Sequence, residues 1–132
     1  MTRMKTQRKE KAKLILKGWS ANQVSQTEGL AFISQTPKAA RARISEFQDE
    51  IPRILVCPRI DWSWSDIVNE VAGVVTDHGT RVSRGSEVSG IVQVPAVLGT
   101  KTATHQIQEG DVIEIFCEGM EAIAKVYSGK TK

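Results

Sequence analysis

The sequence predicts a mixed α/β domain, with a helix crossing over between parallel strands and an antiparallel hairpin at the end. The first indication is the order strand, helix, strand from Ile54 to Thr76, which is typical of a crossover between two parallel strands. The second is a helix signal upstream, over residues 36–50. The third is a pair of apolar, β-rich runs near the C-terminus, separated by a short turn. A chain of 132 residues has the length of one compact domain.

The composition is that of a soluble globular protein. The chain is 40% hydrophobic and 25% charged, which are ordinary values and argue against a disordered or a membrane-embedded chain. No apolar run reaches the length of a membrane span, and no secretory signal follows the start. A cytoplasmic protein is therefore expected.

The N-terminal segment differs in charge from the rest. Residues 1–17 contain seven lysines and arginines and one glutamate, so they are strongly basic, whereas the net charge of the whole chain is only +3. Such a segment can bind nucleic acid, an anionic membrane or an acidic partner. Because no aromatic or glycine residues are interleaved with the charges, a solvated chain end is the favoured interpretation. We expect a flexible leader at residues 1–13 and a single domain at residues 14–132.

The two cysteines, Cys57 and Cys117, lie far apart in β-rich runs. They form neither a zinc motif nor a disulfide framework, so buried reduced thiols are expected. The sequence alone leaves a disulfide between them open.

The first half of the chain contains two extended segments and then a helix. The apolar pieces "LILKGW" and "GLAFIS" predict strands between Leu14 and Ile33. In "TPKAARARISEFQDE", Thr36 can cap the helix and Pro37 suits its first position. Pro52 is expected to end this helix. Its apolar stripe consists of Ala40, Ile44 and Phe47.

A second helix is predicted after the β-rich run "RILVCP", which is expected to be a central strand. In "SWSDIVNEV", Ser63 followed by Asp66 resembles a capping box with the shorter acid. Gly73 is expected to end the helix, immediately before a strand. The apolar stripe of this helix consists of Trp64, Ile67, Val68 and Val71.

The C-terminal part is expected to be mostly β. Helical spacing at Val88, Ile91 and Val92 is weakened by two glycines, each of which costs a helix about 1 kcal/mol relative to alanine. "PAVLG" predicts a strand with Pro95 at its start, because proline cannot donate to a ladder. "DVIEIF" and "EAIAKVY" predict an antiparallel hairpin.

The stretch "ILVCPRIDWSWSDIVNEVAGVVTDHGTRVSRGSEVSGIVQVPAVLGT" resembles the mobile, swivelling phosphohistidine domain of phosphoenolpyruvate-utilising enzymes, a family that includes phosphoenolpyruvate synthase and pyruvate phosphate dikinase. Family members typically read A-x-G-I-V-T-D-x-G-G-x-x-S-H-A-A-I and then G-I-P-A-V-V-G. The match between Thr76 and Thr100 needs no insertion, and the likeness extends from about Leu14 to Gly129. The resemblance implies a three-layer β/β/α fold, with a parallel central sheet and antiparallel hairpins. It also implies a domain that carries a phosphoryl group on one histidine while it swings between two binding sites.

This chain departs from the family at the residue that carries the phosphoryl group. The family histidine aligns with Arg84, which is preceded by Ser83 as in the family, and the second loop glycine aligns with Thr80. A guanidinium group stays protonated and has no lone pair with which to attack phosphorus. By the family's mechanism this chain is not expected to form a phosphohistidine there, so no catalytic residue is assigned.

The chain has only two histidines, His78 and His105. His78 lies in the same loop, at a position that varies in the family, and is a weak candidate for a substitute carrier. His105 precedes the last hairpin and is expected on the surface.

Arg84 offers five donors at the start of an expected helix, where an anion such as phosphate is favoured. An anion clamp is one interpretation, and a solvated arginine on a loop that has lost its chemistry is the other. The residues of the candidate clamp are Arg84, Ser83, Thr80, Arg81 and Ser86.

Three tryptophans are distributed along the domain. Trp64 fits the apolar stripe and is expected in the core. For Trp19 and Trp62, packing is favoured over an exposed docking surface.

The favoured function is a stand-alone docking, regulatory or anion-binding module that has lost its histidine. The alternative is an active phosphoryl-carrier subunit that uses His78. A partner protein bearing nucleotide-binding or phosphoenolpyruvate-binding domains is expected in either case, and nucleic-acid or membrane attachment through residues 1–17 is disfavoured. No P-loop, metal-ligand cluster or Ser/His/Asp set is present, so neither a self-contained enzyme nor a cofactor or metal is expected.

Overall fold

The computed structural model describes residues 11–21, 26–80, 88 and 93–129. The strands of this part are β1 (Leu14–Ser20), β2 (Gln26–Ile33), β3 (Arg53–Cys57), β4 (Gly73–Thr76), β5 (Ala96–Leu98), β6 (Val112–Glu118) and β7 (Glu121–Tyr127). The helical elements are α2 (Pro37–Glu46), the 3-10 turn η1 (Trp62–Trp64), α3 (Ser65–Val68) and α5 (Ala103–Gln106).

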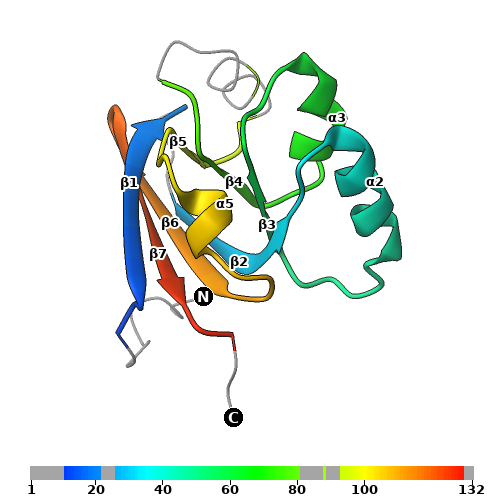
Figure 1. Cartoon of the computed structure of the whole chain (residues 1–132), viewed down its shortest axis with the longest axis horizontal. Coiled ribbons are helices and arrows are strands. Elements are labelled where there is room, and N and C mark those ends of the chain that lie inside the picture. The colour runs from blue at the N-terminus through cyan, green and yellow to red at the C-terminus, as the bar shows by residue number, and fades with distance from the viewer. Residues whose placement is uncertain (1–10, 22–25, 81–87, 89–92, 130–132) are drawn as a thin grey trace.

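The strands close into one barrel in the order β1-β5-β4-β3-β2-β6-β7. Strands β2, β3, β4 and β5 run parallel to their neighbours within that set. β1, β6 and β7 pair antiparallel with each other and with the two ends of the parallel set. The parallel central strands, the crossover between β3 and β4 and the C-terminal hairpin are therefore confirmed. Figure 1 shows the antiparallel strands on one side, the parallel strands in the middle and helices α2 and α3 on the other side.

Alternating side chains of the parallel strands fill two separate cores. In β3, Ile54 and Val56 point into the barrel, whereas Leu55 and Cys57 point to the helices. This alternation follows from the period of two in a strand, and the burial of both faces explains why β3 is apolar throughout. The result is the three-layer β/β/α arrangement that the sequence predicts.

Helix α2 begins as predicted but ends earlier. The Thr36 hydroxyl accepts a hydrogen bond from the Ala39 N–H at 3.2 Å, and Pro37 is the first helical residue. The helix ends at Glu46, so the expectation that Pro52 ends it is wrong. Phe47 adopts an extended backbone instead, which lets its ring pack edge-on against Phe32 with centroids 5.3 Å apart.

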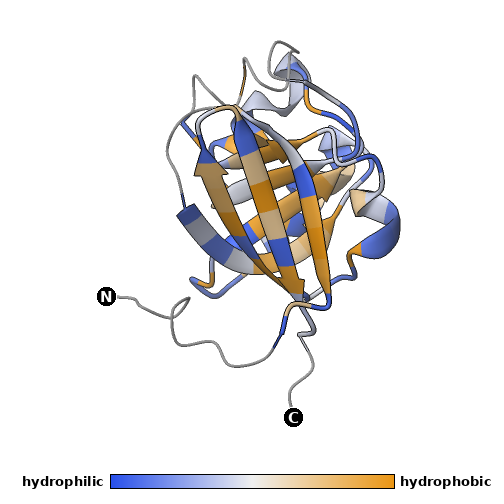
Figure 2. Ribbon diagram, turned by 90° about the vertical axis from the view of Figure 1, so that its left-hand side faces the viewer, coloured by the Kyte–Doolittle hydropathy of each residue, from blue (hydrophilic) through white to orange (hydrophobic). Residues whose placement is uncertain are grey.

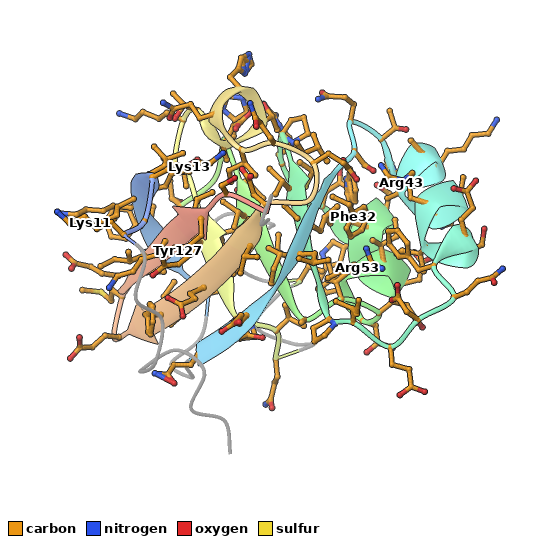
Figure 3. The ribbon with its side chains drawn as sticks, turned by 90° about the horizontal axis from the view of Figure 1, so that it is seen from below. Lys11, Lys13, Phe32, Arg43, Arg53 and Tyr127 are labelled. Atoms are coloured by element: carbon orange, nitrogen blue, oxygen red, sulfur yellow. The ribbon has the colours of Figure 1, made fainter. Side chains whose placement is uncertain are left out.

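Two arginines complete the packing around these rings. The guanidinium carbon of Arg53 lies 3.9 Å from the ring centroid of Phe47, and that of Arg43 lies 5.8 Å from the centroid of Phe32. Figure 3 shows Phe32, Arg43 and Arg53 together on the α2 side of the domain. Arginine over an aromatic face contributes on the order of 0.5–1 kcal/mol at partly exposed sites.

The second helix has a different start from the predicted capping box. Asp61 caps the turn η1 by accepting the Ser63 N–H at 2.9 Å, and the Ser63 hydroxyl also bonds to Asp61. Asp66 forms an ion pair with Arg41 of α2, so the expected Ser63–Asp66 capping box is wrong. The reason is the arginine, since a charge-assisted pair with two bonds outcompetes a cap on a four-residue helix. The stripe from Trp64 to Val71 is buried as predicted.

The expectation that Gly73 ends the second helix is wrong, since α3 ends at Val68 and Gly73 is the first residue of β4. The other expectations for the fold are met where the structure describes them. Pro95 directly precedes β5, and β6 and β7 form the predicted hairpin. Figure 2 shows hydrophilic and hydrophobic bands alternating along the antiparallel strands, one face of which lines the barrel. Cys57 and Cys117 are both buried free thiols. Val88 is helical and buried, while Ile91 and Val92 lie outside the described residues.

Residues 1–10 of the predicted leader lie outside the described residues, but its last residue is held in place. The Lys13 ammonium lies 3.1 Å from the buried carboxylate of Asp111, and the Lys13 N–H bonds to the Val126 carbonyl. Within the described ranges, none of the helices has the length and apolar character needed to cross a membrane.

Candidate functional site

The candidate loop begins where β4 ends, at the edge of the sheet where β3 and β5 also present their carboxyl ends. Residues 77–80 of this loop are described, and residues 81–87 are not. In α/β proteins, ligands typically bind outside the carboxyl ends of parallel strands, because loops from several strands converge there. The geometry of the first loop residues therefore defines the site as far as the structure describes it.

Thr76, the last residue of β4, fixes the start of the loop. Its side chain is completely buried, and its hydroxyl donates to the His78 carbonyl at 2.6 Å. Its own carbonyl accepts both the N–H and the hydroxyl of Thr100, each at 3.0 Å. The loops after β4 and β5 are thus joined through one threonine.

Asp77 connects the loop to a short helix. Its carboxylate accepts the Thr104 N–H at 2.8 Å and the Thr104 hydroxyl at 2.6 Å, which holds α5 against the loop. The Asp77 carbonyl accepts the Lys101 N–H at 2.8 Å. A buried carboxylate is tolerated when it is hydrogen-bonded in this way, and Asp77 is only 6% exposed. We infer that Asp77 positions the loop.

A close approach of two backbones completes the start of the loop. A Cβ atom on Gly99 would lie 2.3 Å from the Gly79 carbonyl oxygen, and Gly99 has a φ of +77°. Both conditions require glycine at position 99. The loop after β4 therefore lies directly against the loop after β5.

The structure describes only part of the predicted anion clamp. Thr80 is exposed, at the end of the described part of the loop. The other members of the clamp, Arg81, Ser83, Arg84 and Ser86, lie outside the described residues. Their role stays a prediction.

The two histidines are both exposed. The backbone of His78 is fixed, since its N–H bonds to the Pro58 carbonyl at 2.9 Å and its carbonyl accepts the Thr76 hydroxyl. His105 lies in α5, where sequence reasoning expected no helix, and its Nδ1 is 3.2 Å from the Thr104 hydroxyl. The surface position expected for His105 is confirmed.

Trp64 is in the core as predicted, but the other two tryptophans are not. Trp19 is 41% exposed and Trp62 is 43% exposed, so the expectation that both pack inside is wrong. Trp19 is on the outer face of the barrel because the side chains of β1 alternate, and Leu16 takes the inner side. Trp62 is at the first position of η1, two residues before the buried stripe begins at Trp64.

No reactive thiol or metal centre is found in the described ranges. Burial raises the pKa of the Cys57 thiol far above its usual value, and the nearby Asp77 carboxylate raises it further, so the sulfur stays protonated. No group of three or more histidine, cysteine, aspartate or glutamate side chains is arranged there to hold a metal ion.

Sequence reasoning missed the positioning residues Asp77, Thr100 and Thr104. Asp77 and Thr76 stand at the T-D pair of the family motif, which was the available signal. Nothing in the sequence linked Thr100 or Thr104 to that pair, because their contacts depend on how the loop after β5 folds back.

The fold and the site define a class of protein: a three-layer domain with a loop whose first residues are fixed at the carboxyl ends of its parallel strands. The family of PEP-utilising enzyme mobile domains matches residues 50–119, which is more than half of the chain. The chain belongs to this family.

Similar proteins include larger enzymes. A phosphoenolpyruvate synthase of Aquifex aeolicus (strain VF5) is 36% identical over 77 residues, which is 58% of this chain and 9% of that protein. An uncharacterised phosphotransferase, YvkC, of Bacillus subtilis (strain 168) is 32% identical over 72 residues, 54% of this chain and 9% of that protein. The matched region thus spans about a tenth of the length of these relatives.

Among solved structures, the solution structure of an Enzyme I protein (nEIt) is 25% identical to this chain. It covers 63% of this chain and 33% of its own, with a TM-score of 0.48.

Proposed function

We propose that this chain is a mobile domain that does not carry a phosphoryl group on its own loop and that acts as a docking, regulatory or anion-binding module. The proposal rests on Arg84, which the resemblance of residues 76–100 to the family motif aligns with the family histidine. An arginine supplies only hydrogen-bond donors, so it can bind a phosphoryl group but cannot accept one covalently.

The described part of the loop supports a binding role, because contacts with the segment after β5 hold its first residues in place. Thr76, Asp77 and Gly79 are each tied to the segment after β5 by hydrogen bonds or close backbone contact. This framework fixes the point from which the loop leaves the sheet.

A phosphorylation assay tests the proposal. The protein is incubated with radiolabelled phosphoenolpyruvate and a phosphoenolpyruvate synthase, and acid-labile, alkali-stable label on the chain is measured. We expect no label on the wild-type chain. The variant Arg84→His is expected to gain label, because it restores an imidazole nucleophile on the same framework. Label on the wild-type chain would contradict the proposal.

His78 is the alternative carrier, and its exposed position keeps it accessible to a partner. If the wild-type chain is labelled and His78→Ala removes the label, the chain is an active phosphoryl carrier. His105→Ala is the matched control, because that histidine is also exposed but belongs to α5.

Anion binding by the loop is tested separately by backbone amide NMR. Inorganic phosphate, pyruvate and phosphoenolpyruvate are titrated, and the shifts of Thr80 to Ser86 are followed. We expect shifts that Arg84→Ala abolishes and that Lys38→Ala, an exposed lysine of α2, leaves unchanged. Equal binding by the two variants would exclude the clamp.

The partner implied by the docking role is a protein that bears nucleotide-binding or phosphoenolpyruvate-binding domains. Support comes from the relatives, in which the matched region is a small fraction of a long chain. Binding is measured by titration calorimetry with a phosphoenolpyruvate synthase from which the mobile domain has been removed. The intact synthase is the control, since its own mobile domain should compete.

A further inference from the structure

A groove beside the candidate loop is lined by charged and aromatic side chains that have no role in the proposed function. It has a volume of about 410 Å³, within the range of small-molecule sites. Its lining includes two lysines, an exposed tryptophan and a glutamate: Lys17, Trp19, Lys101 and Glu121. Gly18 and Gly99 also line it.

Two of the lining side chains are arranged by the strand itself. Lys17 and Trp19 are two residues apart in β1, so both point to the outer face and lie roughly 7 Å apart along the strand. Across β7, Trp19 pairs with Glu121 and Lys17 pairs with Ile123. An ammonium group and an indole face at this spacing match a small molecule with an anionic group and a flat ring.

Lys101 joins the groove from the segment after β5, and its backbone is unusual. It has a φ of +80°, a left-handed conformation that costs a residue with a side chain about 1–2 kcal/mol. Its N–H is held by the carbonyl of the buried Asp77. Strain of this kind is typically kept at binding sites, where the surrounding structure enforces it. In this case it places a second ammonium group at the groove.

Within the described part of the chain, no ion pair neutralises the charged side chains of the groove. No ion pair of Lys17, Lys101 or Glu121 is formed there, unlike Lys13, Arg41, Arg43 and Arg53, which all have carboxylate partners. The two lysines outnumber the one glutamate. The groove therefore favours an anion.

We propose that this groove binds a small aromatic anion, with its ring against Trp19 and its phosphate or carboxylate group between Lys17 and Lys101. Glu121 limits the negative charge that the groove accepts and can take a hydrogen bond from a donor on the ring. The glycines at positions 18 and 99 let the backbones of neighbouring segments approach closely beside the groove, because a Cβ on either would meet a backbone oxygen at 2.3 Å. The proposed contacts use none of the residues of the predicted clamp.

The test is an NMR titration that follows the indole Nε1–H signals of the three tryptophans. The probes are phenyl phosphate and benzoate, with inorganic phosphate as the anion alone and phenol as the ring alone. We expect phenyl phosphate or benzoate to shift the Trp19 signal and to bind at least threefold more tightly than either control. This factor corresponds to the lower range of one aromatic contact or one exposed ion pair. Trp64 is buried and should not respond.

Variants of the lysines and of the glutamate should change the affinity for the aromatic anion in opposite directions. Lys101→Gly removes the ammonium group and relieves the strained backbone, so it should weaken binding about threefold or more without lowering the unfolding temperature. Lys17→Ala should weaken binding similarly, and it provides a second test if the glycine variant does not fold. Glu121→Gln should strengthen binding of the dianionic phenyl phosphate more than that of benzoate, because it removes repulsion.

Two controls separate this site from the loop. Lys38→Ala removes a positive charge far from the groove, on α2, and should have no effect on binding. Arg84→Ala should also have none, even if it abolishes anion shifts in the loop. The proposal is overturned if neither aromatic anion shifts Trp19, if phenol or phosphate alone binds as tightly, or if Lys101→Gly and Lys17→Ala bind like the wild type.

Discussion

The carboxylate of Asp77 receives two hydrogen bonds from a single residue, Thr104, one from its N–H at 2.8 Å and one from its hydroxyl at 2.6 Å. Through this contact the start of the loop after β4 is joined to helix α5. The loop that bears Arg84 therefore starts from a fixed point rather than from a free strand end.

Removal of this carboxylate should destabilise the domain. We expect Asp77→Ala to lower the free energy of unfolding by about 3–4 kcal/mol, since hydrogen bonds to a charged group contribute about 1.5–3 kcal/mol each. Thr104→Val removes only the hydroxyl bond and should cost about 2 kcal/mol. Urea unfolding of both single variants and the double variant measures the coupling. Strictly additive losses would show that the two side chains do not interact.

The contact between Gly79 and Gly99 should make alanine unacceptable at position 99. Gly99→Ala combines a left-handed backbone with a Cβ 2.3 Å from the Gly79 oxygen, and we expect a loss of about 3 kcal/mol or more. Gly110→Ala is a matched control, because Gly110 has a φ of +86° but nothing within 4 Å of the added Cβ. It should cost only about 1–2 kcal/mol. Equal unfolding midpoints for the two variants would contradict the proposed contact.

The ion pair between Arg41 and Asp66 should give the domain an acid-sensitive contribution to its stability. The hydrogen bond from Arg41 holds the pKa of Asp66 below its ordinary value of 3.8. A carboxyl group whose pKa is lowered on folding stabilises the native state above the ordinary value. That stability is lost as the pH falls through the folded-state pKa.

Asp66→Asn should therefore be slightly less stable than the wild type at neutral pH, and the difference should shrink as the pH falls below the ordinary pKa of 3.8. Because both side chains are about half exposed, the difference should be small and should shrink at high salt. Thermal unfolding across this pH range measures it. Glu70→Gln, at an exposed residue near the end of the same helical segment, is the control and should show no such convergence.

The buried thiols should be inert in the folded protein. Burial, reinforced by the Asp77 carboxylate, raises the pKa of Cys57, so the reactive thiolate is scarcely populated. We expect a thiol reagent such as dithionitrobenzoate to label neither Cys57 nor Cys117 until the protein unfolds. Labelling in urea provides the positive control for two free thiols. Rapid labelling of the native protein would mean that the helical layer opens locally.

Short-range patterns predicted the elements that depend on local chemistry. Thr36 and Pro37 started α2 as expected, because a hydroxyl cap and a proline act within a single turn. The apolar stripe from Trp64 to Val71 and the β-rich run of β3 likewise indicated which faces are buried. The three layers agree with the expectation from the family resemblance.

Contacts between distant segments account for the errors. Arg41 draws Asp66 away from a capping role, although the two residues are 25 positions apart. The packing of Phe47 on Phe32 ends α2 before Pro52 is reached. No pattern within a helix contains such information.

By itself, the sequence indicated the order of the strands, the helices α2 and α3, and the family, and it predicts that Arg84 stands at the position of the family histidine. Each of these follows from the types of residues and the spacing between them. Only the tertiary structure decided that Thr76, Asp77 and Gly79 are fixed against the segment after β5, and that Lys17, Trp19 and Lys101 share a groove. The reason is that closing the barrel pairs β1 with β5 and β7, which brings residues more than 80 positions apart in the chain to one face.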